Sequence, residues 1–169
     1  SALKLAGAID ESGAWIGGSM AVVQTGDQLD RGDEEPEVLA LFEELEAKAT
    51  KAGGAFYALD GNHEVMNVAG DFRYVTPDGF HDFRDTPLAG ERGQQAQRLA
   101  EEQRGRAAAF LPGGPTARRL AKRPVVIMVG ETVFVHGGLL PAHLGYGIGR
   151  LNEESRRWMR GDAPRMPEI

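Results

Sequence analysis

Three short motifs in this sequence carry side chains that are typical ligands of metal ions. They are Gly26-Asp27-Gln28-Leu29-Asp30-Arg31-Gly32, Gly61-Asn62-His63-Glu64 and Val135-His136-Gly137-Gly138. A carboxylate that leaves a strand through a glycine, as Asp27 does, is placed to bridge the two cations of a two-metal hydrolytic site. Asn62 offers a neutral oxygen and His136 a neutral nitrogen, and both suit manganese, iron or zinc. We therefore predict that Asp27, Asn62 and His136 bind metal.

Other side chains in the same motifs suit the handling of a phosphate group. Arg31 presents a planar guanidinium that binds two phosphate oxygens at once, which a lysine does not match. Asn62 is predicted to contact the same phosphate. His63 directly follows a metal ligand in the chain and is placed to protonate a leaving oxygen, and Asp30 is expected to fix the tautomer of that imidazole. We predict that His63, Asp30 and Arg31 carry the catalysis.

The motifs also have a purely structural interpretation. On that view they are an Asp-capped turn, a Gly-Asn turn and the end of a hairpin. Their occurrence together, with so many fixed positions, favours the chemical interpretation. The two remaining histidines, His81 and His143, have no such context and are predicted to be packing or surface residues.

The elements that position these motifs follow from the pattern of apolar residues. Residues 20–25 form a short apolar run that ends in a Gly-Asp turn, which predicts a buried strand. A helix is expected over residues 36–49, because Pro36 suits a first helical position and Gly53-Gly54 provides a stop. Residues 55–59 predict a second buried strand that again ends at a motif. Two successive strand–motif–helix units predict a parallel sheet with ligand-bearing loops at its carboxyl end.

The second half of the chain has a different pattern. Residues 70–120 are predicted to form a helical cap inserted within the domain. Within them, residues 91–109 are a polar helical stretch rich in alanine and arginine, with few apolar anchors. Strand pattern returns at residues 125–129 and 132–135, which predicts a hairpin. A last helix is expected near residues 152–160.

Length and composition limit the class of protein. With 169 residues and a mass of 18.2 kDa, residues 1–169 are predicted to form a single domain. The net charge of −6 argues against nucleic acid as a partner and suits a site that attracts cations. The absence of cysteine excludes disulfides and thiolate metal sites. Neither a bilayer-spanning run nor a signal-peptide pattern is visible, so we expect no membrane partner and a cytoplasmic location.

The three motifs resemble the second, third and fourth signature blocks of the phosphoprotein phosphatases, which belong to the calcineurin-like metallophosphoesterase superfamily. The flanking residues are similar to those of the Shewanella-like protein phosphatases. They include Ile16-Gly17-Gly18, Glu64-Val65-Met66-Asn67, Gly70-Asp71-Phe72-Arg73-Tyr74-Val75 and Gly137-Gly138-Leu139-Leu140-Pro141. The resemblance covers most of the chain and implies an α/β fold in which two facing sheets carry helices on the outside.

The resemblance also implies two divalent metal ions in the complete enzyme, with Asp27 bridging them and with Asn62 and His136 on one of them. It implies further ligands from a first block, Gly-Asp-x-His-Gly, and from a later histidine. This sequence contains no Asp-x-His, and no histidine follows His143. We therefore expect an incomplete domain, truncated at both ends and belonging to a longer polypeptide, with fewer than two metals in this chain alone.

The implied function is metal-dependent hydrolysis of phosphomonoesters on phosphorylated proteins or peptides. In this reaction a metal-bridging hydroxide attacks phosphorus while His63 acts as the general acid. Two alternatives remain open. One is hydrolysis of dinucleoside polyphosphates or phosphodiesters on the same scaffold. The other is a catalytically inactive fragment that binds phosphate through Arg31 and the neighbouring glycines.

Overall fold

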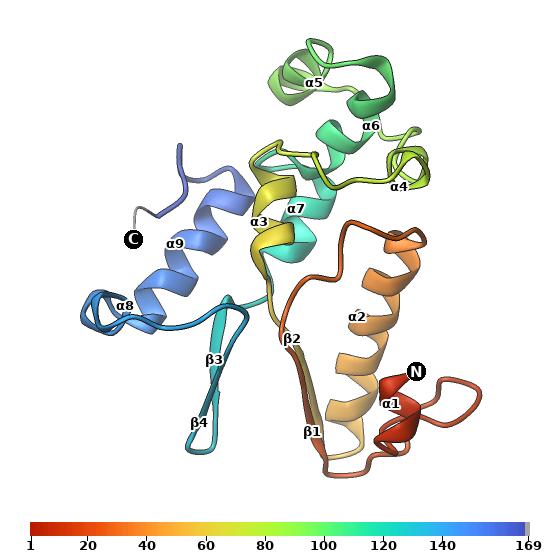
Figure 1. Cartoon of the computed structure of the whole chain (residues 1–169), viewed down its shortest axis with the longest axis vertical. Coiled ribbons are helices and arrows are strands. Elements are labelled where there is room, and N and C mark those ends of the chain that lie inside the picture. Colours follow the sequence, from red (N-terminus) through yellow and green to blue (C-terminus); the bar gives the residue numbers. More distant parts are fainter. Residues whose placement is uncertain (168–169) are drawn as a thin grey trace. The chain divides into compact units, whose positions relative to one another are not determined.

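The computed structural model describes residues 1–167, and the chain divides into two compact units (Figure 1). The first unit holds Ser1–Gln24 and Pro36–Ala58, and the second holds Thr25–Glu35 and the chain from Leu59 onward. The predicted α/β class is confirmed. The assignment of residues 1–169 to one domain stays a prediction.

The first unit contains the two strands that lead into the first two motifs. Strand β1 (Ala21–Gln24) pairs in parallel with strand β2 (Ala55–Ala58), so that Gln24 lies opposite Ala58 at the carboxyl end of both. The predicted strands and their parallel pairing are therefore confirmed, but the prediction that both are buried is wrong, because β1 has no buried residue and β2 buries Phe56 alone. Because parallel strands end on the same side of a sheet, the segments that begin at residues 25 and 59 leave the sheet next to each other.

A long helix stabilises this strand pair. Helix α2 (Glu35–Lys51) confirms the helix predicted from residue 36 and ends close to the expected Gly53-Gly54 stop. It buries Leu45 and Ala49 against Phe56 of β2. The ring of Phe42 meets that of Phe56 at a centroid distance of 5.2 Å. The short helix α1 (Ala2–Leu5) precedes these elements in the chain.

The second unit is mainly helical. Its helices are α3 (Asn62–Val68), α4 (Pro77–His81), α5 (Gly90–Ala96), α6 (Glu101–Phe110), α7 (Pro115–Leu120), α8 (Pro141–Tyr146) and α9 (Ile148–Arg160). The predicted hairpin is confirmed, with strand β3 (Val126–Val129) antiparallel to strand β4 (Thr132–Val135). The predicted last helix is confirmed as α9, although it begins four residues earlier than Asn152. No helix in the described residues is long and apolar enough to cross a membrane.

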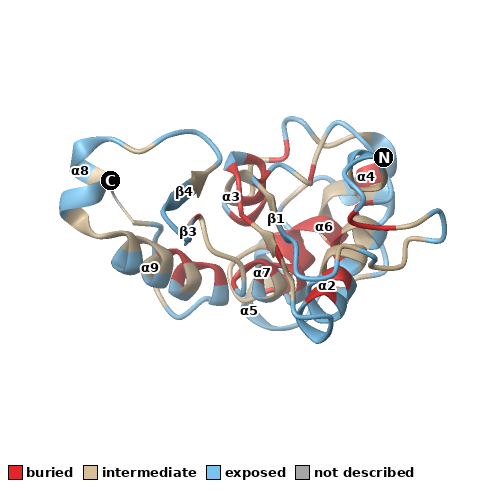
Figure 2. Ribbon diagram, turned by 90° about the horizontal axis from the view of Figure 1, so that it is seen from below, coloured by how far each residue is buried: buried red, intermediate tan, exposed pale blue. Residues whose placement is uncertain are grey.

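The helical segment predicted over residues 91–109 is in fact two helices. Helix α5 ends at Ala96 and α6 begins at Glu101, where two acidic residues in the first turn complement the helix dipole. The prediction of few anchors is wrong for α6, because residues 105–110 are all buried (Figure 2). Gly105 permits this burial, since a Cβ there would lie 2.2 Å from the carbonyl oxygen of Phe83. The insertion of residues 70–120 as a cap stays a prediction.

A single buried carboxylate joins the first two motifs. The side chain of Glu64, on α3, is fully buried. Its Oε1 accepts hydrogen bonds from the backbone N–H groups of Gln28 at 2.8 Å and Leu29 at 3.2 Å. Its Oε2 accepts from the N–H groups of Asp27 at 2.8 Å and Gly61 at 2.6 Å. Glu64 therefore fixes the backbone of the first motif against the start of α3.

The first motif needs such support because its backbone is strained. Four residues other than glycine have positive φ between residues 27 and 34, namely Asp27 at +59°, Asp30 at +69°, Arg31 at +57° and Glu34 at +64°. This left-handed conformation is uncommon for residues with a side chain and costs free energy at each position. The hydrogen bonds to Glu64 offset part of that cost, since they satisfy amide groups that a strained loop would otherwise leave without partners.

We expect Glu64→Gln to lower the free energy of unfolding by about 2 kcal/mol or more, because the amide replaces one acceptor oxygen with a donor that faces backbone N–H groups. Urea denaturation followed by circular dichroism measures this change. Glu34→Gln, at an exposed position of the same loop, is the matched control and should shift stability by no more than about 0.5 kcal/mol. Equal stability of the two variants would contradict the role assigned to Glu64.

Candidate metal and phosphate site

All six predicted site residues lie in the second unit, and four of them meet in two pairs. The Nε2 atom of His136 lies 3.1 Å from Oδ2 of Asp27, and each side chain keeps 30% of its surface exposed. The Nδ1 atom of His136 lies 3.0 Å from the carbonyl oxygen of Thr25. Since a carbonyl only accepts, Nδ1 donates its proton to Thr25, and Nε2 is the ring nitrogen that faces Asp27. This arrangement is typical of a histidine that binds a metal through Nε2.

Two glycines allow the three motifs to approach so closely. A Cβ on Gly26, whose φ is +107°, would lie 2.7 Å from the backbone nitrogen of Gly61 and 3.1 Å from Nδ1 of His136. A Cβ on Gly61 would lie 2.4 Å from Oδ1 of Asp27. Any side chain at either position would separate the motifs, which explains why both ligand-bearing loops begin with glycine.

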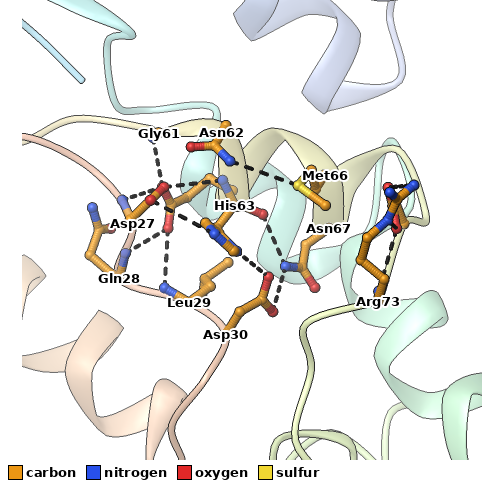
Figure 3. Close-up of polar contacts among 12 residues, drawn as sticks. Asp27, Gln28, Leu29, Asp30, Gly61, Asn62, His63, Met66, Asn67 and Arg73 are labelled. Atoms are coloured by element: carbon orange, nitrogen blue, oxygen red, sulfur yellow. Dashed lines mark hydrogen bonds and ion pairs between the residues drawn. The ribbon is translucent and has the colours of Figure 1, made fainter. Parts of the chain in front are cut away.

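Asn62 is oriented differently from the other two predicted metal ligands. It is exposed at the start of α3, and its amide nitrogen is directed at the sulfur of Met66, 3.8 Å away (Figure 3). It nevertheless lines one cavity with His136, of about 420 Å³. The structure thus brings Asp27 and His136 into contact and places Asn62 at a cavity that His136 also lines.

The predicted pair of His63 and Asp30 is formed (Figure 3). The Nδ1 atom of His63 lies 2.6 Å from Oδ2 of Asp30, and the two side chains are 6% and 1% exposed. The backbone N–H of His63 donates to Oδ1 of Asp27 at 3.1 Å, while its Nε2 lies 3.9 Å from Oδ2 of the same residue. His63 therefore turns one ring nitrogen toward Asp30 and the other toward Asp27.

Arg31 contacts an aromatic ring that also contacts His63. Its guanidinium carbon lies 4.8 Å from the ring centroid of Tyr74, and its backbone N–H donates to the carbonyl oxygen of Tyr74 at 3.1 Å. The same ring lies 5.2 Å from the ring of His63. Because the guanidinium is exposed, it is available to bind an anion.

Several buried residues that support the site were not singled out from the sequence. Asn67 and Arg106 both donate to Oδ1 of Asp30, at 3.0 and 3.3 Å. Glu35 accepts from the backbone N–H of Asp30 at 2.7 Å. Burial raises the pKa of Glu35, and the hydrogen bond from Arg106 opposes that effect. The sequence signals of these residues were the similar flanking segment that contains Asn67 and the arginine- and alanine-rich run that contains Arg106.

Asp60 adds an unusual group to the cavity lined by Asn62 and His136. Its side chain is buried, and neither carboxyl oxygen has a hydrogen-bond partner among the described residues. Burial raises the pKa of Asp60 well above its ordinary value, and the nearby charge of Glu64 adds to this effect. A buried carboxyl group without partners favours its neutral form.

The donors of this site suit a divalent metal, although they form only part of a coordination shell. Asp27 and His136 present a carboxylate oxygen and an imidazole nitrogen to one point, a combination that manganese, iron and zinc accept. Among residues 1–167, no three side chains of histidine, aspartate, glutamate or cysteine gather closely enough to enclose a metal. The residues present therefore fit a metal site that needs further ligands.

Comparisons with known proteins identify the family of this chain. The family of calcineurin-like phosphoesterases matches residues 17–164 of the chain, and enzymes of this family use divalent metal ions. Shewanella-like protein phosphatase 2 from Arabidopsis thaliana is 43% identical over 186 aligned residues, which cover 95% of this chain and 48% of the plant protein. Shewanella-like protein phosphatase 1 from Plasmodium berghei is 30% identical over 132 residues, which cover 78% of this chain and 32% of that protein.

Solved structures agree with the sequence relatives. The crystal structure of the cold-active protein-tyrosine phosphatase of a psychrophile, Shewanella sp., superposes with a TM-score of 0.68 and 28% identity, over 93% of this chain and 43% of that one. The chain thus spans about half the length of these relatives or less. The predicted resemblance to the Shewanella-like protein phosphatases is confirmed. On its sequence match and its fold, the chain belongs to the calcineurin-like phosphoesterase family.

Proposed function

We propose that this protein is a metal-dependent phosphoprotein phosphatase that hydrolyses phosphomonoesters, with His63 as the general acid. The observation that carries the proposal is the buried pair of His63 and Asp30, 2.6 Å apart, next to Asp27. Family membership supports a phosphoester as the substrate. The relatives named above are protein phosphatases, which supports a phosphorylated protein or peptide in particular.

Asp27, His136 and Asn62 are the residues that would hold divalent metal in this chain. When bound, a pair of such ions supplies Lewis acidity toward the phosphate and lowers the pKa of a bound water. The Nδ1–H of His136 donates to Thr25, which keeps its Nε2 free for coordination. Asn62 lines the same cavity as His136.

Arg31 and His63 have separate roles, in phosphate binding and in proton donation. Arg31 binds two oxygens of the phosphate through its planar guanidinium, and Tyr74 holds that guanidinium beside His63. Asn62 is the second predicted phosphate contact. Because Asp30 accepts the Nδ1–H of His63, the Nε2 atom is the one that donates a proton to the leaving oxygen. Proton transfer matters most for alkoxide or phenolate leaving groups, such as serine, threonine or tyrosine side chains.

The test of this proposal compares substrate classes. The full-length protein is loaded with Mn²⁺ and assayed on phosphotyrosine and phosphoserine peptides and on a dinucleoside polyphosphate. The proposal expects kcat/KM to be higher on the phosphopeptides. A higher value on the dinucleotide would assign the protein to the alternative hydrolase, and binding of phosphopeptide without turnover would make it an inactive phosphate-binding protein.

We expect His63→Asn to lower kcat on phenyl phosphate by about 10² to 10⁴-fold, because general acid catalysis contributes that much. Bound metal, measured by elemental analysis, should be unchanged. His81→Asn, which alters an exposed histidine of α4, is the matched control and should retain full activity. Equal losses of kcat with phenyl and p-nitrophenyl phosphate would count against proton donation by His63, since the second leaving group needs little help.

We expect Asp27→Asn to lose both bound metal and turnover, because an amide replaces the charged oxygens that bring the cations together. Elemental analysis and calorimetric titration with Mn²⁺ measure the first effect, and p-nitrophenyl phosphate hydrolysis measures the second. Asp85→Asn, which changes a carboxylate that is 91% exposed, serves as control. Retention of metal in Asp27→Asn at the level of the control would refute the assignment of this ligand.

A further inference from the structure

Arg106 is a deeply buried cation near the site, and it takes no direct part in the proposed reaction. It lies on α6, and its side chain is fully buried. A charged guanidinium removed from water costs several kcal/mol unless charges and hydrogen bonds compensate it. The rings of Phe83 and Phe110 flank it at 5.2 and 4.7 Å from the guanidinium carbon, so little of the compensation comes from solvent.

The compensation comes from groups around His63. The Nη1 atom of Arg106 donates to Oε2 of Glu35 at 2.5 Å and to the carbonyl oxygen of Gly79 at 2.8 Å. Its Nη2 donates to Oδ1 of Asp30 at 3.3 Å, and its Nε donates to Oδ1 of Asn67 at 2.8 Å. All three nitrogens are therefore engaged, in a planar fork that only arginine provides.

The bond to Asn67 has a directional consequence. Because Arg106 donates to the amide oxygen of Asn67, the amide nitrogen of Asn67 must face the other way. That nitrogen donates to Oδ1 of Asp30 at 3.0 Å and to the carbonyl oxygen of His63 at 2.9 Å. Arg106 thereby selects one of the two amide orientations, and it is the one that supports the pair of Asp30 and His63.

The carboxylate of Asp30 is oriented by the same set. Its Oδ1 receives donors from Arg106 and Asn67, which leaves Oδ2 for Nδ1 of His63. Glu35 also fixes the position of Asp30, since one of its oxygens accepts from Arg106 and the other accepts from the backbone N–H of Asp30. The position of the His63 ring thus depends on a residue that is 76 positions from Asp30 in the chain.

We propose that Arg106 is a positioning residue for His63, and that helix α6 is therefore part of the catalytic apparatus. This inference rests on the proposed function, in which His63 donates a proton. It states that the guanidinium fixes the rotamers of Asp30 and Asn67, and through them directs Nε2 of His63 at the leaving group. Arg106 itself does not touch the substrate, because it is fully buried.

The experiment compares Arg106→Lys with wild type in the full-length protein, loaded with diamagnetic Zn²⁺ for NMR and with Mn²⁺ for kinetics. Arg104→Lys is the matched control, because Arg104 lies on the same helix and donates to the carbonyl oxygen of Leu99. The first readout is the low-field proton resonance of His63 Nδ1–H, observed by NMR with isotope-labelled histidine and identified by its loss in His63→Asn. The second is kcat and KM on phenyl phosphate and on p-nitrophenyl phosphate.

We expect Arg106→Lys to lose the low-field resonance, because lysine does not satisfy Asp30, Asn67 and Glu35 together. We also expect kcat on phenyl phosphate to fall about tenfold or more, within the contribution of a general acid, with KM changed by less than about twofold. The loss with p-nitrophenyl phosphate should be much smaller. A residue that only stabilises the fold would lower both rates equally or leave both unchanged, and either result overturns the inference.

Glu35→Gln tests the positioning role of Arg106 if Arg106→Lys fails to fold. It keeps the size and shape of the side chain while weakening the bond to Arg106, and it should give the same pattern with a smaller loss. An unchanged resonance and unchanged kcat in Glu35→Gln would overturn the inference.

The two proposals fail in different ways. A wild-type protein that shows the resonance but hydrolyses neither phosphate, with the resonance lost in Arg106→Lys, would sink the phosphatase and leave the positioning role standing. If Arg106→Lys hydrolyses both substrates as well as wild type does, the phosphatase proposal stands and the positioning role fails. Absence of the resonance from the wild type would also contradict the positioning role.

Discussion

The carboxylate of Glu64 is the interaction on which the arrangement of the site depends. Four backbone amides from two distant motifs converge on its two oxygens, in a place without solvent. A buried charge is costly unless several donors surround it, and here the donors belong to the loops that carry Asp27 and His63. The requirement to satisfy Glu64 therefore also sets the distance between a candidate metal ligand and a candidate general acid.

Buried carboxylates also hold the strained backbone of the first motif in place. A loop with positive φ at Asp27, Asp30 and Arg31 would relax if it were free. Its amides are held by Glu64 and Glu35, so the side chains leave the backbone in directions that an ordinary turn does not allow. Asp27 turns toward His136, and Asp30 toward His63. The strained backbone thus brings together groups that attract cations and hold protons, as is common at functional sites.

The motifs predicted which side chains would come together at the candidate site because ligand chemistry depends on residue type and order. The contacts of Asp27 with His136 and of Asp30 with His63 have the geometry that those motifs lead one to expect. The strands and the helix α2 were predictable because their apolar periodicity is local. Asn62 shows the limit of this reasoning, since its residue type suits a metal but its amide nitrogen faces Met66. The rotamer of an exposed side chain depends on its neighbours, which a motif does not specify.

By itself, the sequence determined the chemistry available to this protein: carboxylate, imidazole, amide and guanidinium groups at the ends of two parallel strands and a hairpin. Only the tertiary structure decided that Arg106, in a polar alanine-rich run, would lie buried against Asp30 and Asn67. The physical reason is that the helix propensity of arginine is the same on an exposed face of a helix as on a buried one. What makes burial favourable is the set of acceptors that the fold collects around it, and those acceptors come from residues 35, 67 and 79, far away in the chain.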